Sequence, residues 1–138
     1  MTMEEVEYRT PNGLHDAYLL GLSTDYKAGT LTLDLEWFVG LSTDLPEARP
    51  EYKPGQLVIS GLRYCVIESP EKGDGTAPDQ INGFATGGDE IQRCHLPDVD
   101  DGIFRHTIYL GYWTSFIHFA GANAEVFPPS LIVREMGA

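Results

Sequence analysis

The chain has 138 residues and a formal net charge of -12, from 21 acidic and 9 basic side chains. This length is typical of one domain with one hydrophobic core, and a hydrophobic content of 42% is too high for an intrinsically disordered chain. The acidic balance argues against nucleic acid and anionic membranes as partners, and no apolar run approaches the roughly 20 residues of a membrane-spanning helix.

The first residues and the cysteines indicate the compartment. Residues 1–8 carry acidic side chains where a secretory signal peptide has basic ones, so we expect a cytoplasmic protein. Cys65 and Cys94 each lie in an apolar alternating segment. In a reducing compartment such residues usually pack as small hydrophobic side chains, and we therefore expect free, buried thiols.

A hairpin is predicted near the start of the chain. Residues 30–37 alternate between polar and apolar, which predicts a half-buried strand whose inner side chains are Leu31, Leu33, Leu35 and Trp37. Before it, residues 14–25 predict a weaker strand with Leu20 and Leu22 on one face, and residues 26–29 supply a turn that ends in glycine.

The middle of the chain predicts two long loops around one strand. Residues 39–56 contain three prolines and predict a surface loop with at most one helical turn. Residues 57–68 are apolar on both faces, as is typical of an interior strand, with a bulge near Gly61. Residues 69–90 hold many glycines but little periodicity, which predicts a second long irregular loop.

The last third of the chain predicts more strands. Residues 91–96 form a short one, residues 103–110 and 113–120 a second hairpin, and residues 125–133 one or two extended pieces around two prolines. No segment shows a helical stripe of useful length. We therefore predict a mainly β chain, with residues 1–138 folding as one antiparallel sandwich or partly open barrel of about six to eight strands.

The register of the second hairpin decides whether His106 and His118 meet. Gly111 favours a two-residue loop, which pairs His106 with Ile117 and sets His118 opposite Arg105 on the other face. A three-residue loop would instead set the two histidines across from each other as a metal-binding or pH-sensing pair, but its glycine would not occupy the preferred position. We favour the separated histidines.

Two sets of residues suggest acid-base chemistry. His15 and Asp16 are adjacent, and a carboxylate can hold an imidazole for general-base catalysis. Adjacent strand residues point to opposite sides, however, so we favour a turn in which Asp16 bonds backbone amides. Asp34 and Glu36 share one strand face at a separation that glycosidases also use, but the alternation already predicts a solvated face.

Two groups contain metal-ligating residue types. Asp98, Asp100 and Asp101 precede Gly102 as in a calcium loop, but the glycine falls at position 5 and not 6, so a type I turn is the favoured interpretation. The second group lacks the short paired spacing of zinc motifs: Cys94, His95, His106 and His118. We expect neither a metal nor another cofactor.

Candidate interaction residues lie in the predicted loops and the acidic turn. Tyr52 and Phe84 are aromatic side chains that can anchor a partner, and Asp98, Asp100 and Asp101 supply exposed charge. The aromatic-rich second hairpin packs either into the core or against a second copy of the chain, so a monomer and a homodimer both remain open.

Two stretches resemble a group of small uncharacterised bacterial mainly-β proteins. Residues 14–19, Leu-His-Asp-Ala-Tyr-Leu, followed by Asp25, a glycine turn and the strand at 30–37, look like their opening. Residues 113–126, with Phe-Ile-His-Phe-Ala and Ala-Glu-Val, are similar to their closing strands. Some proteins of this kind are thought to be immunity proteins that neutralise bacterial toxins, which is what the resemblance implies. It assigns no functional residue.

Two functional hypotheses follow. The first is a non-enzymatic interaction protein, such as an inhibitor of a basic partner, because a charge of -12 steers a cationic surface into contact. The second is a small-molecule binder or minor hydrolase that uses the mouth of a β-barrel, with His15, Asp16 and either His95 or His106 near the opening. One concentrated acidic face would favour the first, and a deep pocket joining those side chains the second.

Overall fold

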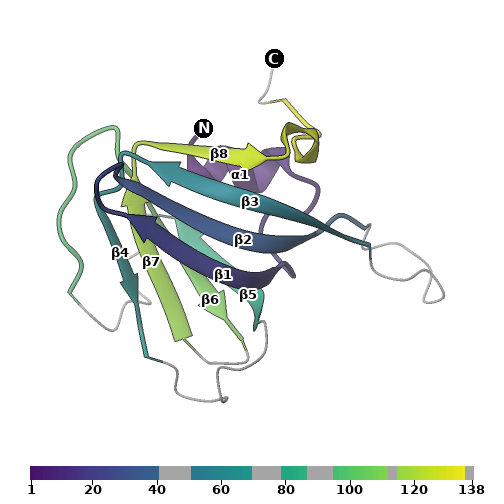
Figure 1. Ribbon diagram of the computed structural model, residues 1–138, viewed down its shortest axis with the longest axis horizontal. Coiled ribbons are helices and arrows are strands. Elements are labelled where there is room, and N and C mark those ends of the chain that lie inside the picture. The colour runs from purple at the N-terminus through teal and green to yellow at the C-terminus, as the bar shows by residue number, and fades with distance from the viewer. Residues whose placement is uncertain (41–50, 70–78, 87–94, 112–114, 136–138) are drawn as a thin grey trace.

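The computed structural model describes residues 1–40, 51–69, 79–86, 95–111 and 115–135, without the side chains of residues 79, 80 and 82–86. These residues confirm a mainly β fold (Figure 1). None of the described helices is long and apolar enough to cross a membrane. The elements are α1 (Met3–Arg9), β1 (Tyr18–Asp25), β2 (Thr30–Phe38), β3 (Tyr52–Ser60), β4 (Tyr64–Ile67), β5 (Asp79–Thr86), β6 (Phe104–Leu110), β7 (Ser115–Gly121), β8 (Asn123–Phe127) and a 3-10 turn, η1 (Pro129–Leu131).

The strands form two facing layers. Their order is β4-β7-β6-β5-β1-β2-β3-β8, and all neighbours are antiparallel. β1 and β5 share only two residue pairs, so the order folds there into the layers β4-β7-β6-β5 and β1-β2-β3-β8 (Figure 1). Within the described residues β4 and β8 pair on one side only, so the barrel is not closed and the fold is an open sandwich.

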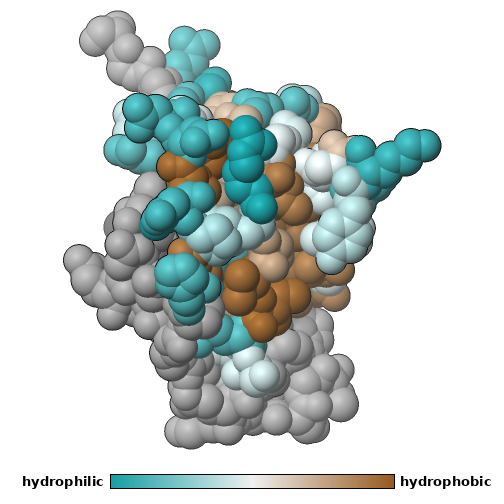
Figure 2. All heavy atoms as spheres, turned by 90° about the vertical axis from the view of Figure 1, so that its left-hand side faces the viewer, coloured by the Kyte–Doolittle hydropathy of each residue, from teal (hydrophilic) through white to brown (hydrophobic). Residues whose placement is uncertain are grey.

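The chain crosses between the layers at two neighbouring corners. Gly61 (φ +61°) ends β3, and a Cβ at this position would lie 2.6 Å from Ala122 Cβ in the corner between β7 and β8. Only glycine adopts this conformation in so little space. The single strand predicted at residues 57–68 is therefore wrong, because its second half is β4 in the other layer. Figure 2 shows the end with these corners, where a band of hydrophobic side chains reaches the surface among hydrophilic ones.

The two predicted loops are shorter than expected. β3 begins at Tyr52, inside the loop predicted at residues 39–56, and β5 lies inside the loop predicted at residues 69–90. β3 tolerates Pro54 because its pairing with β8 begins only at Gln56, so no β8 residue needs the missing N–H. Residues 41–50, 70–78 and 87–94 lie outside the described residues, and with them most of the strand predicted at residues 91–96.

Both predicted hairpins are present. The first joins β1 to β2, as predicted. In the second, Leu110 pairs with Ser115, which leaves residues 111–114 between β6 and β7, and the two-residue loop is therefore wrong. A shift of two residues keeps every side chain on its face, so His106 and His118 remain on opposite faces, as predicted.

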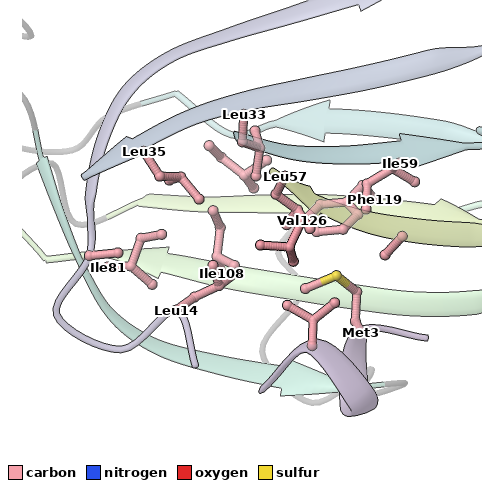
Figure 3. Close-up of a cluster of buried hydrophobic side chains, with 14 of the residues drawn as sticks. Met3, Leu14, Leu33, Leu35, Leu57, Ile59, Ile81, Ile108, Phe119 and Val126 are labelled. Carbon is pink, nitrogen blue, oxygen red and sulfur yellow. The ribbon is translucent and has the colours of Figure 1, made fainter. Parts of the chain in front are cut away.

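The core lies between the layers (Figure 3). All four residues predicted to face inward from β2 are at most 1% exposed: Leu31, Leu33, Leu35 and Trp37. All four belong to one continuous cluster with Ile108 and Phe119 of the other layer, and Figure 3 shows Leu33 and Leu35 between the layers. Period-two alternation thus identified the core face of β2 correctly, because this strand has one buried face.

α1 covers the side of the sandwich between β8 and β6 (Figure 1), and the sequence analysis did not predict it. Met3 and Val6 are fully buried in the core cluster. The helix begins with a capping box, in which the Glu5 N–H donates to Thr2 Oγ1 (3.2 Å) and the Thr2 N–H donates to Glu5 Oε1 (3.3 Å). The Thr2-x-x-Glu5 pattern was the available signal, but α1 is too short to show a stripe.

Candidate functional site

His15 and Asp16 lie in a turn before β1 and not in a strand. A strand would make their side chains diverge. In the turn they instead lie close together, with His15 Nε2 3.6 Å from Asp16 Oδ1. Asp16 has a left-handed backbone (φ +65°), and its N–H donates to the Ile81 carbonyl oxygen at 2.8 Å. The His15 side chain is 56% exposed, so this pair sits on the surface.

His106 lies on the core side of β6 and faces a carboxylate from α1. Its Nε2 is 3.5 Å from Glu7 Oε1, and its ring is 5.5 Å from that of Phe119. The other Glu7 oxygen accepts a hydrogen bond from the Leu14 N–H at 2.9 Å. Glu7 is 9% exposed. It therefore joins the helix, the turn before β1 and β6, which is a structural role.

His118 lies on the outer side of β7 and is held through both ring nitrogens. Nδ1 is 2.8 Å from Thr107 Oγ1, and Nε2 contacts Glu68 Oε2. This hydroxyl, imidazole and carboxylate chain has the composition of a hydrolase triad, but the Thr107 residue is only 4% exposed. Glu68 directly follows β4, so the chain joins β4, β7 and β6. Sequence reasoning missed it because Glu68 is distant along the chain.

The metal and thiol candidates gain no chemical support. Among the described residues, no three potential metal ligands come together. His95 is exposed, and Cys94 lies outside the described residues. Cys65 is a free thiol, as predicted, but it is half-buried and not fully buried, and this burial raises its pKa to about 11. It is therefore protonated at neutral pH and a weak nucleophile.

The acidic turn is exposed. Asp98, Asp100 and Asp101 reach the solvent, and Asp98 lies 3.8 Å from the Arg105 guanidinium. The Ile103 N–H donates to the Asp100 carbonyl oxygen at 3.2 Å, which closes a turn. Gly102, its third residue, has φ +84°, as in a type II turn and not the predicted type I turn.

Phe84 lies in β5, opposite Ile108, and not in a loop as predicted. Its side chain lies outside the described part of the structure.

Tyr52 belongs to an aromatic cluster on the outer face of β1, β2 and β3. Its ring centroid is 5.3 Å from that of Tyr18 and 5.5 Å from that of Phe38. Tyr18 pairs across the strands with Glu36, and Tyr52 pairs with Phe38, so the side chains share one face. A hollow of about 360 Å³ is lined by Tyr18, Leu20, Glu36 and Tyr52.

A β-bulge places Leu20 on this face. Leu19 pairs with Leu35 and Gly21 with Asp34, so Leu20 is the extra residue of β1. The bulge separates Leu20 from Leu22, which the sequence analysis expected on the same face. Leu22 packs against the core, whereas Leu20 is 49% exposed. Bulges that redirect a side chain in this way are common next to functional sites.

A second hollow of about 500 Å³ continues from Leu20 along the same face. It is lined by Leu20, Asp34, Leu35, Pro54, Gly55, Gln56, Phe127 and Pro128. Asp34 Oδ1 accepts a hydrogen bond from Gln56 Nε2 at 2.7 Å. Phe127 is 41% exposed. The two hollows therefore combine exposed apolar side chains with two acidic residues, and we call them together the β1-β2-β3 face.

The two carboxylates of this face differ in their partners. Asp34 is engaged by Gln56, whereas no hydrogen bond or ion pair within the described residues engages the Glu36 carboxylate. The predicted solvated face of β2 is confirmed by the alternating burial of its residues. The aromatic side chains near Glu36, Tyr18 and Tyr52, could not be predicted from the pattern of β2, because they come from β1 and β3.

A third hollow, of about 460 Å³, lies near the 3-10 turn and is lined by Pro11, Val39, Lys53, Leu131 and their neighbours. None of the three hollows is lined by His15, Asp16, His106 or Thr107.

The chain matches no family model, and comparisons with curated proteins and with solved structures find no match. Any functional assignment therefore rests on the chain's own residues.

Proposed function

We propose that this protein is a non-enzymatic interaction protein that binds a basic protein partner through the β1-β2-β3 face. The observation that carries the proposal is the hollow lined by Tyr18, Tyr52, the half-exposed Leu20 and the acidic residue Glu36. Aromatic side chains in a hollow are the usual anchors of protein interfaces. A carboxylate beside them selects a partner of positive charge.

The exposure of Leu20 supports a binding role over a purely structural one. Burying a leucine side chain fully contributes about 2 kcal/mol, and the bulge gives up roughly half of this by leaving Leu20 at 49% exposure. A partner that covers the β1-β2-β3 face would recover that contribution. Leu20 lines both hollows, so one partner can contact them together.

The net charge of -12 supports a basic partner. Diffuse negative charge accelerates the encounter with a cationic surface, and the exposed Asp98, Asp100 and Asp101 add to it. An immunity-type inhibitor of a basic toxin is one form of this function, consistent with the resemblance in residues 14–19. The alternative, a small-molecule binder or hydrolase built on His15 and Asp16, draws no support from the hollows.

Affinity capture with paired variants tests the proposal. The wild-type protein, the double variant Tyr18→Ala, Leu20→Ser and the control Ile67→Ser are immobilised and exposed to extract of the source cells. Ile67 is 53% exposed on β4, in the other layer, so it matches Leu20 in chemistry and exposure.

We expect a basic protein to be retained by the wild type and by Ile67→Ser and to be lost from the double variant. Equal retention by all three proteins, or retention of acidic proteins only, would contradict the proposal. Unchanged circular dichroism of each variant shows that a lost partner does not reflect unfolding.

A further inference from the structure

We infer that the hollow around Glu36 is a subsite for one arginine side chain of the partner. The inference rests on the proposed function for the source of that side chain, and on the geometry of the hollow for its chemistry.

Glu36 lies between aromatic side chains from both neighbouring strands. Tyr18 is its direct partner on β1, and Tyr52 comes from β3 on the other side. The two rings are 5.3 Å apart between centroids and inclined by 48°, so they do not stack flat on each other. Tyr18, Tyr52 and Glu36 all line the same hollow.

A cation is the ligand group that suits both components. The face of a tyrosine ring attracts positive charge, and the carboxylate attracts it more strongly. The Glu36 carboxylate has no ion pair or hydrogen bond within the described residues, so it is available for this contact. A neutral polar ligand would gain only the hydrogen bonds, and an anion would be repelled.

Guanidinium fits better than ammonium. It is planar, stacks on aromatic rings and offers two parallel N–H groups to one carboxylate, whereas a lysine ammonium is a compact and strongly hydrated charge. The exposed Leu20 side chain, which also lines the hollow, can contact the methylene stem of an arginine. A volume of about 360 Å³ is at the lower end for ligand pockets and suits one side chain on an extended or loop segment.

Asp34 provides an internal control for this subsite. It is a carboxylate on the same face of β2, two positions from Glu36. Its Oδ1 is already engaged by Gln56 Nε2, and its hollow is not lined by a tyrosine. Changing Asp34 or Glu36 to its amide removes the same charge, so only a specific subsite distinguishes the two variants.

The test is an NMR titration of the full chain with N-acetyl-arginine amide. The neutral isostere N-acetyl-citrulline amide and N-acetyl-lysine amide are the comparison probes. We expect arginine to shift the signals of Tyr18, Leu20 and Tyr52 at millimolar concentration, with lysine weaker and citrulline without effect. Glu36→Gln should weaken arginine binding by about fivefold, as for the loss of one partly exposed charge-assisted bond, and Asp34→Asn by less than about twofold.

Equal binding of arginine and citrulline, equal effects of the two amide variants, or shifts confined to other residues would overturn the subsite. These results are separable from the capture experiment. If the basic partner still requires Tyr18 and Leu20 but Glu36→Gln changes neither titration nor capture, the subsite is wrong and the proposed function stands. If arginine binds as expected but no basic protein is captured, the subsite stands and the proposed function is wrong.

Discussion

Truncating Leu20 and Leu35 separately tests the β-bulge on which the β1-β2-β3 face depends. Leu35 is 1% exposed, so Leu35→Ala removes a buried side chain and leaves a cavity, which should lower the free energy of unfolding by about 3 kcal/mol. Leu20 is 49% exposed and borders open hollows, so Leu20→Ala should lower it by about 1 kcal/mol, with no closed cavity. At about 4 °C per kcal/mol for a domain of this size, the melting temperature should fall by about 12 °C and about 4 °C respectively.

Thermal and urea unfolding, followed by circular dichroism, measure both values. Leu22→Ala serves as a control, because Leu22 packs partly against the core and should lie between the other two. A loss for Leu20→Ala as large as for Leu35→Ala would refute the bulge. So would a smaller loss for Leu22→Ala than for Leu20→Ala, because Leu20 would then be the buried residue.

Further predictions concern Glu7, Gly55 and Cys65. Glu7→Ala should lower the free energy of unfolding by about 2 kcal/mol in urea, because it removes the acceptor of the buried Leu14 N–H; a change below about 1 kcal/mol would contradict this. Gly55→Ala should destabilise by about 2 kcal/mol, since its Cβ would lie 2.7 Å from the Phe127 carbonyl oxygen; an unchanged melting temperature would show that the site adapts. The Cys65 thiol, with its pKa raised to about 11, should react slowly with iodoacetamide at about pH 8 and faster as the pH approaches that pKa. Because the folded state keeps this proton longer than the unfolded state, the contribution of Cys65 to stability is present below about pH 9 and is lost as the pH rises toward about 11.

The features that were predictable from the sequence are those set by local pattern. β2 has one core face and one solvent face, so its alternation identified Leu31, Leu33, Leu35 and Trp37 without knowledge of its neighbours. The turn before β2 was equally local, because Gly29 adopts the left-handed conformation (φ +68°) that its position requires. The predicted loop length was wrong, but the register differs from the predicted one by two residues, an even number. His106 and His118 therefore still lie on opposite faces, as predicted.

The features that were missed depend on partners distant in the chain. Whether Leu20 is an extra residue in β1 depends on its register with β2, which β1 alone does not determine. Gly61 was interpreted as a bulge because the change of layer becomes evident only when β4 pairs with β7. The aromatic neighbours of Glu36 were missed because they belong to other strands. The β1-β2-β3 face therefore becomes recognisable only after the strands are placed side by side.

The association kinetics of the captured basic partner test the proposed function most directly. Because diffuse charge is screened beyond about 8 to 10 Å, the association rate should fall by about tenfold or more between about 50 mM and about 300 mM salt, while dissociation changes by less than about threefold. Glu36→Gln should mainly speed dissociation, whereas replacing Asp98, Asp100 and Asp101 together by Asn should only slow association modestly. An association rate that ignores salt, or a Glu36→Gln variant that dissociates like the wild type, would contradict binding through the β1-β2-β3 face.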